Sequence, residues 1–265
     1  MLTSTGYLQV QGSLAFVEIY GAGPTVLLVH TAGQSGVQWR HTVPDLVDAG
    51  YRVVVPDLPG HGRSEPHPSG PVQDLGDYAA WCLDVMQLLE CARFSVVGCS
   101  IGGKVALDLA CRASGRLDAA IGMAAVAGRP ALSEAAQRRE LEDCASPSRG
   151  DRTFLGTLAS VGSATPEAQA RLLATMHRRE DPMVSTSDLI GWSRHDVSAA
   201  LPTVSCPVHV IAGAEDYWID IDKARSTAEA IPGARFTVLD GVGHYPMEEI
   251  ADFGAQLVSW LRGCV

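Results

Sequence analysis

Ser100, at the end of an apolar run, is the residue most able to do chemistry. It stands in Gly98–Gly102, which reads Gly-Cys-Ser-Ile-Gly and fits the G-x-S-x-G pattern. The largely apolar residues 94–97 predict a buried strand, and the apolar spacing from Ile101 to Leu109 predicts a helix. A serine at such a corner holds its hydroxyl above the edge of a sheet. The pattern also fits a turn whose serine only caps the helix. The other residues that a nucleophile needs must distinguish these two interpretations.

A nucleophilic serine needs a base, because its hydroxyl is a weak nucleophile at neutral pH. The base is usually a histidine oriented by a carboxylate. Where the three residues follow one another along the chain as serine, acid and histidine, the histidine comes after the last strand. Of the 8 histidines, His244 alone stands there, with Gly241 and Gly243 before it to let the loop fold back. The others are interpreted as structural: His30, His41, His61, His67, His177, His195 and His209. We therefore predict His244 as the base.

The acid is expected in the loop after the preceding strand, where Asp216 stands. Glu215 is its nearest rival in that loop. Asp220 and Asp222 are better explained as the start of a helix, where carboxylates complement the helix dipole. Asp240 fits an ordinary turn residue. We therefore predict that Asp216 orients the base.

Attack of a serine on an acyl carbon places negative charge on an oxygen, which two N–H groups must stabilise. The first is the N–H of Ile101, directly after the serine. The second is expected from the loop after the apolar run 25–30, where Ala32 is the best candidate. The sequence thus supplies every group that acyl transfer by Ser100 requires.

A nucleotide-binding site is the competing interpretation of the same turn. Gly98–Lys104 also matches G-x-x-x-x-G-K, and the strand–loop–helix context is shared with phosphate-binding loops. Val105, however, stands where a serine or threonine must bind Mg²⁺. This single residue weighs against nucleotide binding.

Strands and helices alternate along the chain in the order that such a site requires. We expect a hairpin over 7–20, strands at 25–30, 51–56, 94–99, 117–126, 208–212 and 235–239, and helices at 77–90, 101–110 and 221–231, with a closing helix through 250–261. This order predicts an α/β fold with a mostly parallel eight-stranded sheet and helices on both faces.

Residues 130–201 differ from the rest of the chain: charge rises, long apolar strands vanish and prolines interrupt short helical segments. We interpret them as an inserted helical cap, and residues 1–129 with 202–265 as the core domain. The pairs Arg138-Arg139 and Arg178-Arg179 are interpreted as solvated faces. An apolar pocket could be lined by Phe154, Leu155, Leu158, Leu172, Met176, Met183 and Trp192, joined by Trp218 and Tyr245, although such residues are more often plain packing.

Composition narrows the class of partner. The 265 residues are 46% hydrophobic and 19% charged, with a net charge of −10 that argues against nucleic acid and anionic membranes. No apolar run approaches the roughly 20 residues of a membrane helix, and no signal peptide begins the sequence. The 7 cysteines include no Cys-x-x-Cys pair, which favours free thiols in the cytoplasm. We expect a small-molecule substrate, no metal and no cofactor, and the sequence leaves a homodimer open.

Several motifs, in order, make the chain resemble the α/β-hydrolase family over nearly its whole length: His30–Gly33 with Trp39, Pro56–Ser64, Gly98–Gly103, Gly213–Asp216 and Gly241–Glu248. Linked motifs are far more specific than any one of them. The resemblance implies nucleophile Ser100, acid Asp216, base His244, oxyanion donors Ala32 and Ile101, and a substrate-covering cap. The substrate contacts expected on this basis are Thr31, Trp39, Met176, Trp192, Trp218 and Tyr245.

One position departs from the family pattern, since members usually carry His-Gly where this chain has His30-Thr31. Losing that glycine restricts the loop, and the Thr31 hydroxyl could itself face the substrate. The resemblance leaves the reaction open among ester, lactone and thioester hydrolysis, C–C bond hydrolysis of vinylogous diketones, and peracid formation. A small-ligand receptor without turnover is the alternative from another class, because fold does not determine function.

Overall fold

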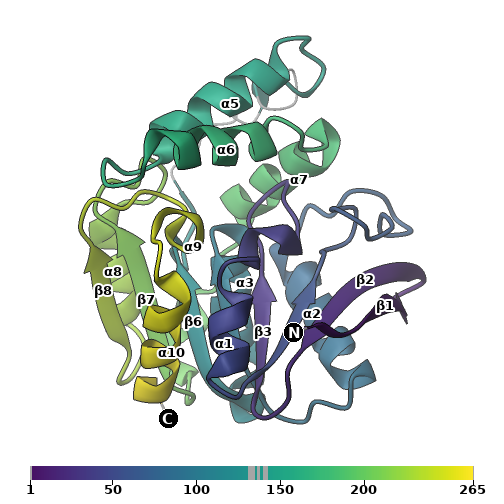
Figure 1. The fold of residues 1–265 in the computed structure, drawn as a ribbon, viewed down its shortest axis with the longest axis vertical. Helices are drawn as coiled ribbons and strands as arrows, with labels where there is room; N and C mark the ends of the chain where they lie inside the picture. Colours follow the sequence, from purple (N-terminus) through teal and green to yellow (C-terminus); the bar gives the residue numbers. More distant parts are fainter. Residues whose placement is uncertain (1, 131–134, 136–137, 140–142, 265) are drawn as a thin grey trace.

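One eight-stranded sheet organises the chain, in the order β1-β2-β4-β3-β5-β6-β7-β8 (Figure 1). The computed structural model describes residues 2–130, 135, 138–139 and 143–264. The strands are β1 Leu2–Val10, β2 Ser13–Tyr20, β3 Thr25–Val29, β4 Arg52–Pro56, β5 Phe94–Cys99, β6 Leu117–Met123, β7 Val208–Gly213 and β8 Arg235–Leu239. β2 pairs antiparallel with β1 and β4, and all other pairs are parallel. The predicted sheet is confirmed.

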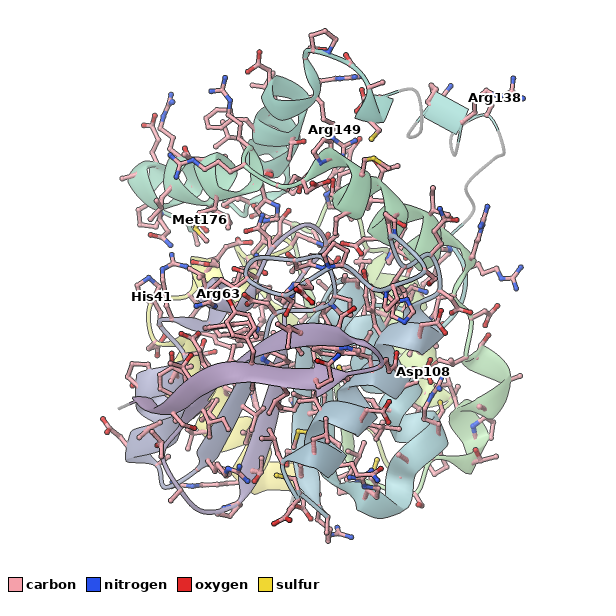
Figure 2. The ribbon with its side chains drawn as sticks, turned by 90° about the vertical axis from the view of Figure 1, so that its right-hand side faces the viewer. His41, Arg63, Asp108, Arg138, Arg149 and Met176 are labelled. Carbon is pink, nitrogen blue, oxygen red and sulfur yellow. The ribbon has the colours of Figure 1, made fainter. Side chains whose placement is uncertain are left out.

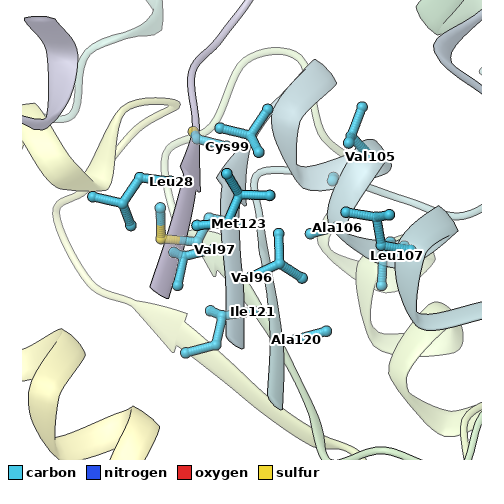
Figure 3. Packing of buried hydrophobic residues seen from close by; sticks show 14 of the residues in the cluster. Leu28, Val96, Val97, Cys99, Val105, Ala106, Leu107, Ala120, Ile121 and Met123 are labelled. Carbon is cyan, nitrogen blue, oxygen red and sulfur yellow. The ribbon is translucent and has the colours of Figure 1, made fainter. Parts of the chain in front are cut away.

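Helices cover both faces of this sheet, which is why its central strands are continuous apolar runs. α1 (Val43–Asp48) and α10 (Phe253–Cys264) lie on one face, and α2 (Leu75–Leu88), α3 (Ile101–Ala113) and α8 (Ile221–Glu229) lie on the other (Figure 1). Every residue of β3 and β5 is buried. Figure 3 shows the core around β5 and α3, formed by Leu28, Val96, Val97, Cys99, Val105, Ala106, Leu107, Ala120, Ile121 and Met123.

Three helices lie above the carboxyl ends of the strands (Figure 1): α5 (Arg149–Ser160), α6 (Glu167–His177) and α7 (Pro182–Arg194). The 3-10 helix η3 (Ser198–Thr203) leads back to β7. We call α5–α7 the cap helices. The boundaries 130 and 201 stay a prediction, and within that region residues 131–134, 136–137 and 140–142 lie outside the described residues.

Lys104, the lysine of the phosphate-loop-like pattern, has a structural role. Its side chain is buried in α3, and Nζ donates to the carbonyl oxygens of Gly128 (2.8 Å) and His195 (3.0 Å). These two residues flank the segment that carries the cap helices. Burial lowers the pKa of Lys104 to about 8. The Lys104 ammonium thus binds the chain both where it leaves the core for the cap helices and where it returns from them.

The predicted strand 117–126 is three residues too long. β6 ends at Met123: Ala124 still donates its N–H to Ile211 of β7 (2.9 Å), but its positive φ of 47° turns the chain out of the extended conformation. The closing helix was also predicted to reach back to Ile250. The structure instead has a short helix α9 (Pro246–Glu249) directly after His244, and α10 begins at Phe253.

Candidate active site

Ser100 stands at a tight corner between β5 and α3, with φ 58° and ψ −116°. A non-glycine residue rarely takes this conformation, which makes it a marker of functional sites. The corner closes only because its neighbours lack a Cβ. A Cβ on Gly102 would overlap the carbonyl oxygen of Val29 and lie 2.7 Å from that of His30. Gly102 therefore allows the close approach of α3 to the end of β3, and Gly98 leaves room for the backbone of Gly102 and Gly103.

His244 and Asp216 are joined by a hydrogen bond. His244 Nδ1 lies 2.9 Å from both carboxylate oxygens of Asp216, whose side chain is fully buried. Asp216 Oδ1 also accepts the backbone N–H groups of Trp218 (2.8 Å) and Ile219 (3.1 Å), which orient the carboxylate. With the Nδ1 proton directed at Asp216, Nε2 of a neutral imidazole carries the lone pair that a base needs.

Ser100 and His244 line the same cavity. Cys99 Sγ donates to the carbonyl oxygen of His244 (3.2 Å), which brings the histidine loop against the residue before the serine. Within the described part of the chain, the Ser100 hydroxyl makes no hydrogen bond to His244 or to another residue. Such bonds are often long without substrate and tighten in the complex, so the arrangement is compatible with nucleophile and base.

A buried carboxylate that the sequence reasoning missed holds the histidine loop. Glu249 Oε2 accepts the N–H groups of Gly243 and Gly162, each at 2.8 Å, and Oε1 accepts that of Tyr245 at 2.8 Å. These contacts hold the backbone on both sides of His244. The available signal was a carboxylate five residues after the histidine.

The loop after β3 presents an unengaged N–H group to the cavity. Thr31 donates its N–H and its hydroxyl to Gln38 Oε1, both at 3.0 Å, and Gln34 N–H donates to the carbonyl oxygen of Thr31 at 3.3 Å. Gly33 N–H is also engaged, by Asp188 Oδ2 at 2.9 Å. Among the described residues, the Ala32 N–H has no acceptor, and Ala32 lines the cavity. This is what a donor to an oxyanion requires.

Ile101 begins α3, so its N–H has no intrahelical partner, and it meets no acceptor within the described ranges. The departure at Thr31 has a simple consequence. Thr31 does not have a positive φ, so this loop needs no glycine there, and its hydroxyl is bound to Gln38 while the residue lines the cavity.

The cavity has a volume of about 200 Å³. We call the part of the cavity lined by Ser100 and His244 its reaction end, and the part lined by residues of the cap helices its far end. The inward stripe of α5 is polar at helical spacing, with Arg149, Thr153 and Thr157 lining the cavity, and Figure 2 shows Arg149 among the helices above the sheet. His177, Glu180 and Ser185 also line it. The cap therefore contributes polar side chains to the cavity beside the apolar Leu189 and Trp192.

Of the apolar residues considered for a pocket lining, Trp192, Trp218 and Tyr245 line the cavity. Leu155, Leu172 and Met183 are instead exposed, at 63%, 47% and 61%. The arginines predicted to be solvated (138, 139, 178 and 179) are exposed, as expected.

The six expected substrate contacts divide into two groups. The four that line the cavity are Thr31, Trp192, Trp218 and Tyr245. Trp39 and Met176 do not line it, and we correct both assignments. Trp39 is fully buried in the core, with its ring 6.5 Å from that of Phe253, so no substrate reaches it. Met176 is a partly exposed residue of α6, whereas its neighbour His177 faces the cavity.

Charged groups at the far end of the cavity neutralise one another. Arg149 binds Glu180 (3.3 Å), Asp143 (3.1 Å) and the hydroxyl of Ser185 (2.9 Å). His177 Nδ1 lies 3.8 Å from Glu180 Oε2. The far end thus carries hydrogen-bonding side chains whose positive and negative charges are paired with each other.

The rival acids and histidines have other partners. Glu215 is exposed and accepts the N–H and hydroxyl of Ser163, and Asp220 caps α8, as predicted. His209 is buried with Nε2 2.8 Å from the Thr237 hydroxyl. His30 accepts the Leu58 N–H at Nε2 (3.0 Å), and burial followed by the charge of His61 lowers its pKa to about 4.

A mostly parallel sheet, a strained serine between strand and helix, and a His–Asp pair above the same sheet edge define the class of α/β hydrolases. The "Alpha/beta hydrolase family" model matches residues 26–257, and the chain belongs to this family. It is a hydrolase.

Two curated relatives and one solved structure are similar to the chain over most of its length. It is 29% identical to the magnesium-chelatase 30 kDa subunit of Rhodobacter capsulatus, over 91% of this chain and 88% of that protein. It is 29% identical to the pimeloyl-[acyl-carrier protein] methyl ester esterase of Vibrio atlanticus, over 92% and 96%. The enol-lactonase of Burkholderia xenovorans shares the fold with a TM-score of 0.86 and 23% identity, over 97% of this chain and 100% of that chain.

No helix in the described ranges is long and apolar enough to cross a membrane.

Proposed function

We propose that the protein hydrolyses a small carboxylic ester, lactone or thioester through an acyl-enzyme on Ser100. The observation that carries this proposal is the His244–Asp216 hydrogen bond beside the cavity that Ser100 lines. The relatives add support, since one is named as an ester hydrolase and a structural neighbour as a lactonase.

In this mechanism His244 Nε2 takes the Ser100 proton while Oγ bonds to the acyl carbon. The carbonyl oxygen becomes an oxyanion, stabilised by the N–H groups of Ala32 and Ile101. Collapse breaks the bond to the leaving group, which receives the proton from His244. Water, deprotonated by His244, then cleaves the acyl-enzyme and frees the acid, and the proton returns to Ser100.

The cavity favours a small substrate with a hydrogen-bonding group. Its volume of about 200 Å³ lies below the roughly 300–1,000 Å³ of pockets for drug-sized ligands. The hydroxyls of Thr153 and Thr157 already donate to the carbonyl oxygens of Arg149 (3.1 Å) and Thr153 (2.8 Å), so at the far end they can still accept a hydrogen bond from a polar substituent of the substrate. We therefore propose short acyl groups or ones that carry a polar substituent.

Other reactions use the same groups. C–C bond hydrolysis of a vinylogous diketone and peracid formation need the same serine, histidine and acid, and a receptor without turnover would keep the cavity alone. A substrate panel separates them: p-nitrophenyl acetate, butyrate and octanoate, γ-butyrolactone, acetyl-CoA, acetate with hydrogen peroxide, and a 2-hydroxy-6-oxodienoate.

The test compares wild type with Ser100→Ala and with Ser95→Ala, a buried serine of the same strand. We expect turnover of a short ester, lactone or thioester by wild type and Ser95→Ala, and loss of at least about 10³-fold in Ser100→Ala. Full activity of folded Ser100→Ala would exclude the mechanism. Preference for the oxodienoate would select C–C hydrolysis, and no turnover of any compound would favour the receptor.

A further inference from the structure

A buried carboxylate of the cap reaches the loop that carries Ala32. Asp188, on α7, is fully buried. Its Oδ2 accepts the N–H of Gly33 (2.9 Å) and contacts His61 Nε2 (2.7 Å), and its Oδ1 accepts the hydroxyl of Tyr78 (2.7 Å). One cap side chain thus binds three separate segments of the core: the loop after β3, the loop after β4, and α2.

The Asp188 contact with His61 is an ion pair. His61 Nδ1 faces the carbonyl oxygen of Pro59 (3.1 Å), which can only accept, and Nε2 faces the carboxylate. Both ring nitrogens therefore carry protons and the ring is cationic. Burial alone would lower the pKa of His61, but the charge and hydrogen bond of Asp188 hold it above its usual value. Neither side chain is exposed, so each charge depends on the other.

The loop around Ala32 is anchored on both sides. On one side Gln38 takes the N–H of Thr31, and on the other Asp188 takes that of Gly33. Gly33 has a φ of 65°, and a Cβ there would lie 2.9 Å from the Cβ of Ser185, so only glycine lets the loop lie this close to α7. The direction of the free Ala32 N–H therefore depends on Gln38, from the core, and on Asp188, from the cap.

We propose that Asp188 is a positioning residue for the oxyanion hole: by binding the Gly33 N–H from the cap, it aims the Ala32 N–H at the reacting oxygen. The His61 partner keeps the carboxylate charged and in place. As a consequence, the oxyanion hole is complete only when α7 is seated on the core. The inference rests on the proposed function, because it concerns the donor that this mechanism assigns to Ala32.

The informative variant is Asp188→Asn, which keeps the shape of the side chain. The NH₂ group stands at one of the two oxygen positions: at Oδ2 it faces the Gly33 N–H and His61, whereas at Oδ1 it can donate to the Tyr78 hydroxyl and leave the Gly33 bond intact. Asp188→Ala, which removes both oxygens, is therefore measured beside it and decides the outcome. The matched control is Ser187→Ala, on the same helix. Ser187 donates to the carbonyl oxygen of Val72 (2.9 Å), so this control removes a buried tie between α7 and the core without touching the loop.

Three readouts are compared: kcat and KM for p-nitrophenyl acetate, inhibition by a trifluoromethyl ketone whose hemiketal adduct with Ser100 places an oxyanion in the hole, and amide hydrogen exchange of residues 31–34. We expect Asp188→Ala to lower kcat by roughly 10- to 100-fold with KM within about 3-fold. Inhibition by the ketone should weaken by a similar factor, and the amide hydrogen of Gly33 should exchange faster than in wild type. Ser187→Ala should keep kcat within about 3-fold of wild type.

The inference is overturned if folded Asp188→Ala keeps wild-type kcat, or if Ser187→Ala loses kcat equally, since the role would then be a general attachment of the cap. A change confined to KM overturns it as well. Failure of the proposed function looks different: wild type would hydrolyse nothing and bind no ketone, while faster Gly33 exchange in Asp188→Ala would still support loop positioning.

Discussion

Replacing Asp216 by asparagine tests the orientation of the base at the level of single atoms. Oδ1 accepts the N–H groups of Trp218 and Ile219, so the amide oxygen of an asparagine must take that place. The NH₂ group then falls at Oδ2, so His244 Nδ1, which lies 2.9 Å from both oxygen positions, has a donor beside it as well as an acceptor. A donor there favours the tautomer with a proton on Nε2, where it cannot accept one from Ser100.

The expected loss is large because the base is present but in the wrong protonation state. Wrong-tautomer variants of such triads lose about 10⁴-fold in kcat, which corresponds to roughly 5 kcal/mol of transition-state stabilisation. The Asp216 side chain is fully buried and its two backbone contacts survive, so folding should change little. We expect KM for p-nitrophenyl acetate to stay within about 3-fold.

The assay is steady-state hydrolysis with circular dichroism melting of the same samples. Glu215→Gln is the matched control, since Glu215 is exposed and binds only Ser163 among the described residues, and this variant should keep wild-type kcat. The reasoning fails if folded Asp216→Asn retains more than about a tenth of the activity, or if Glu215→Gln loses it.

Three further predictions concern the elbow, the buried histidines and the cavity. Gly102→Ala should destabilise the fold by about 3 kcal/mol or more, because its Cβ meets the backbone of Val29 and His30; Gly115→Ala, with no atom within 4 Å, should change urea unfolding little. NMR titration should find His30 neutral down to about pH 4. Its contribution to the stability of the fold is present above pH 6.5 and falls by roughly 3 kcal/mol between pH 6.5 and pH 4, because the unfolded chain binds a proton at this histidine and the folded chain does not. His61, with its pKa raised, should contribute oppositely, losing its stabilisation as pH rises above 6.5; a normal titration of both rings refutes this assignment. Acetate and butyrate esters should exceed the octanoate at least tenfold in kcat/KM, and equal values would contradict the polar far end.

Much of the reaction end could be predicted because each piece depends on local sequence. A glycine-flanked serine after an apolar run, an aspartate after β7 and a histidine after β8 each occupy the end of a strand, and parallel strands bring their carboxyl ends to one edge. The hairpin of β1 and β2 also depends on local sequence: two alternating segments are joined by a tight turn at Gln11 and Gly12, whose φ values are 48° and 91°.

The cap side could not be predicted in this way. The inward stripe of α5 is polar because it borders a cavity, and periodicity alone cannot tell a cavity from a core. Asp188 meets Gly33, His61 and Tyr78 across 155, 127 and 110 residues, and no spacing in the sequence indicates such contacts. Trp39 misled because a motif match gives a position in the chain without saying that its side chain reaches the site.

The central claim is that Ser100 is the nucleophile, and covalent labelling tests it most directly. The protein is treated with a fluorophosphonate, digested and mapped by mass spectrometry, with Ser100→Ala and Ser95→Ala alongside. The account predicts a single adduct on the peptide that contains Ser100, present in Ser95→Ala and absent in Ser100→Ala. An unlabelled wild-type protein, or an adduct that persists in folded Ser100→Ala, would contradict it.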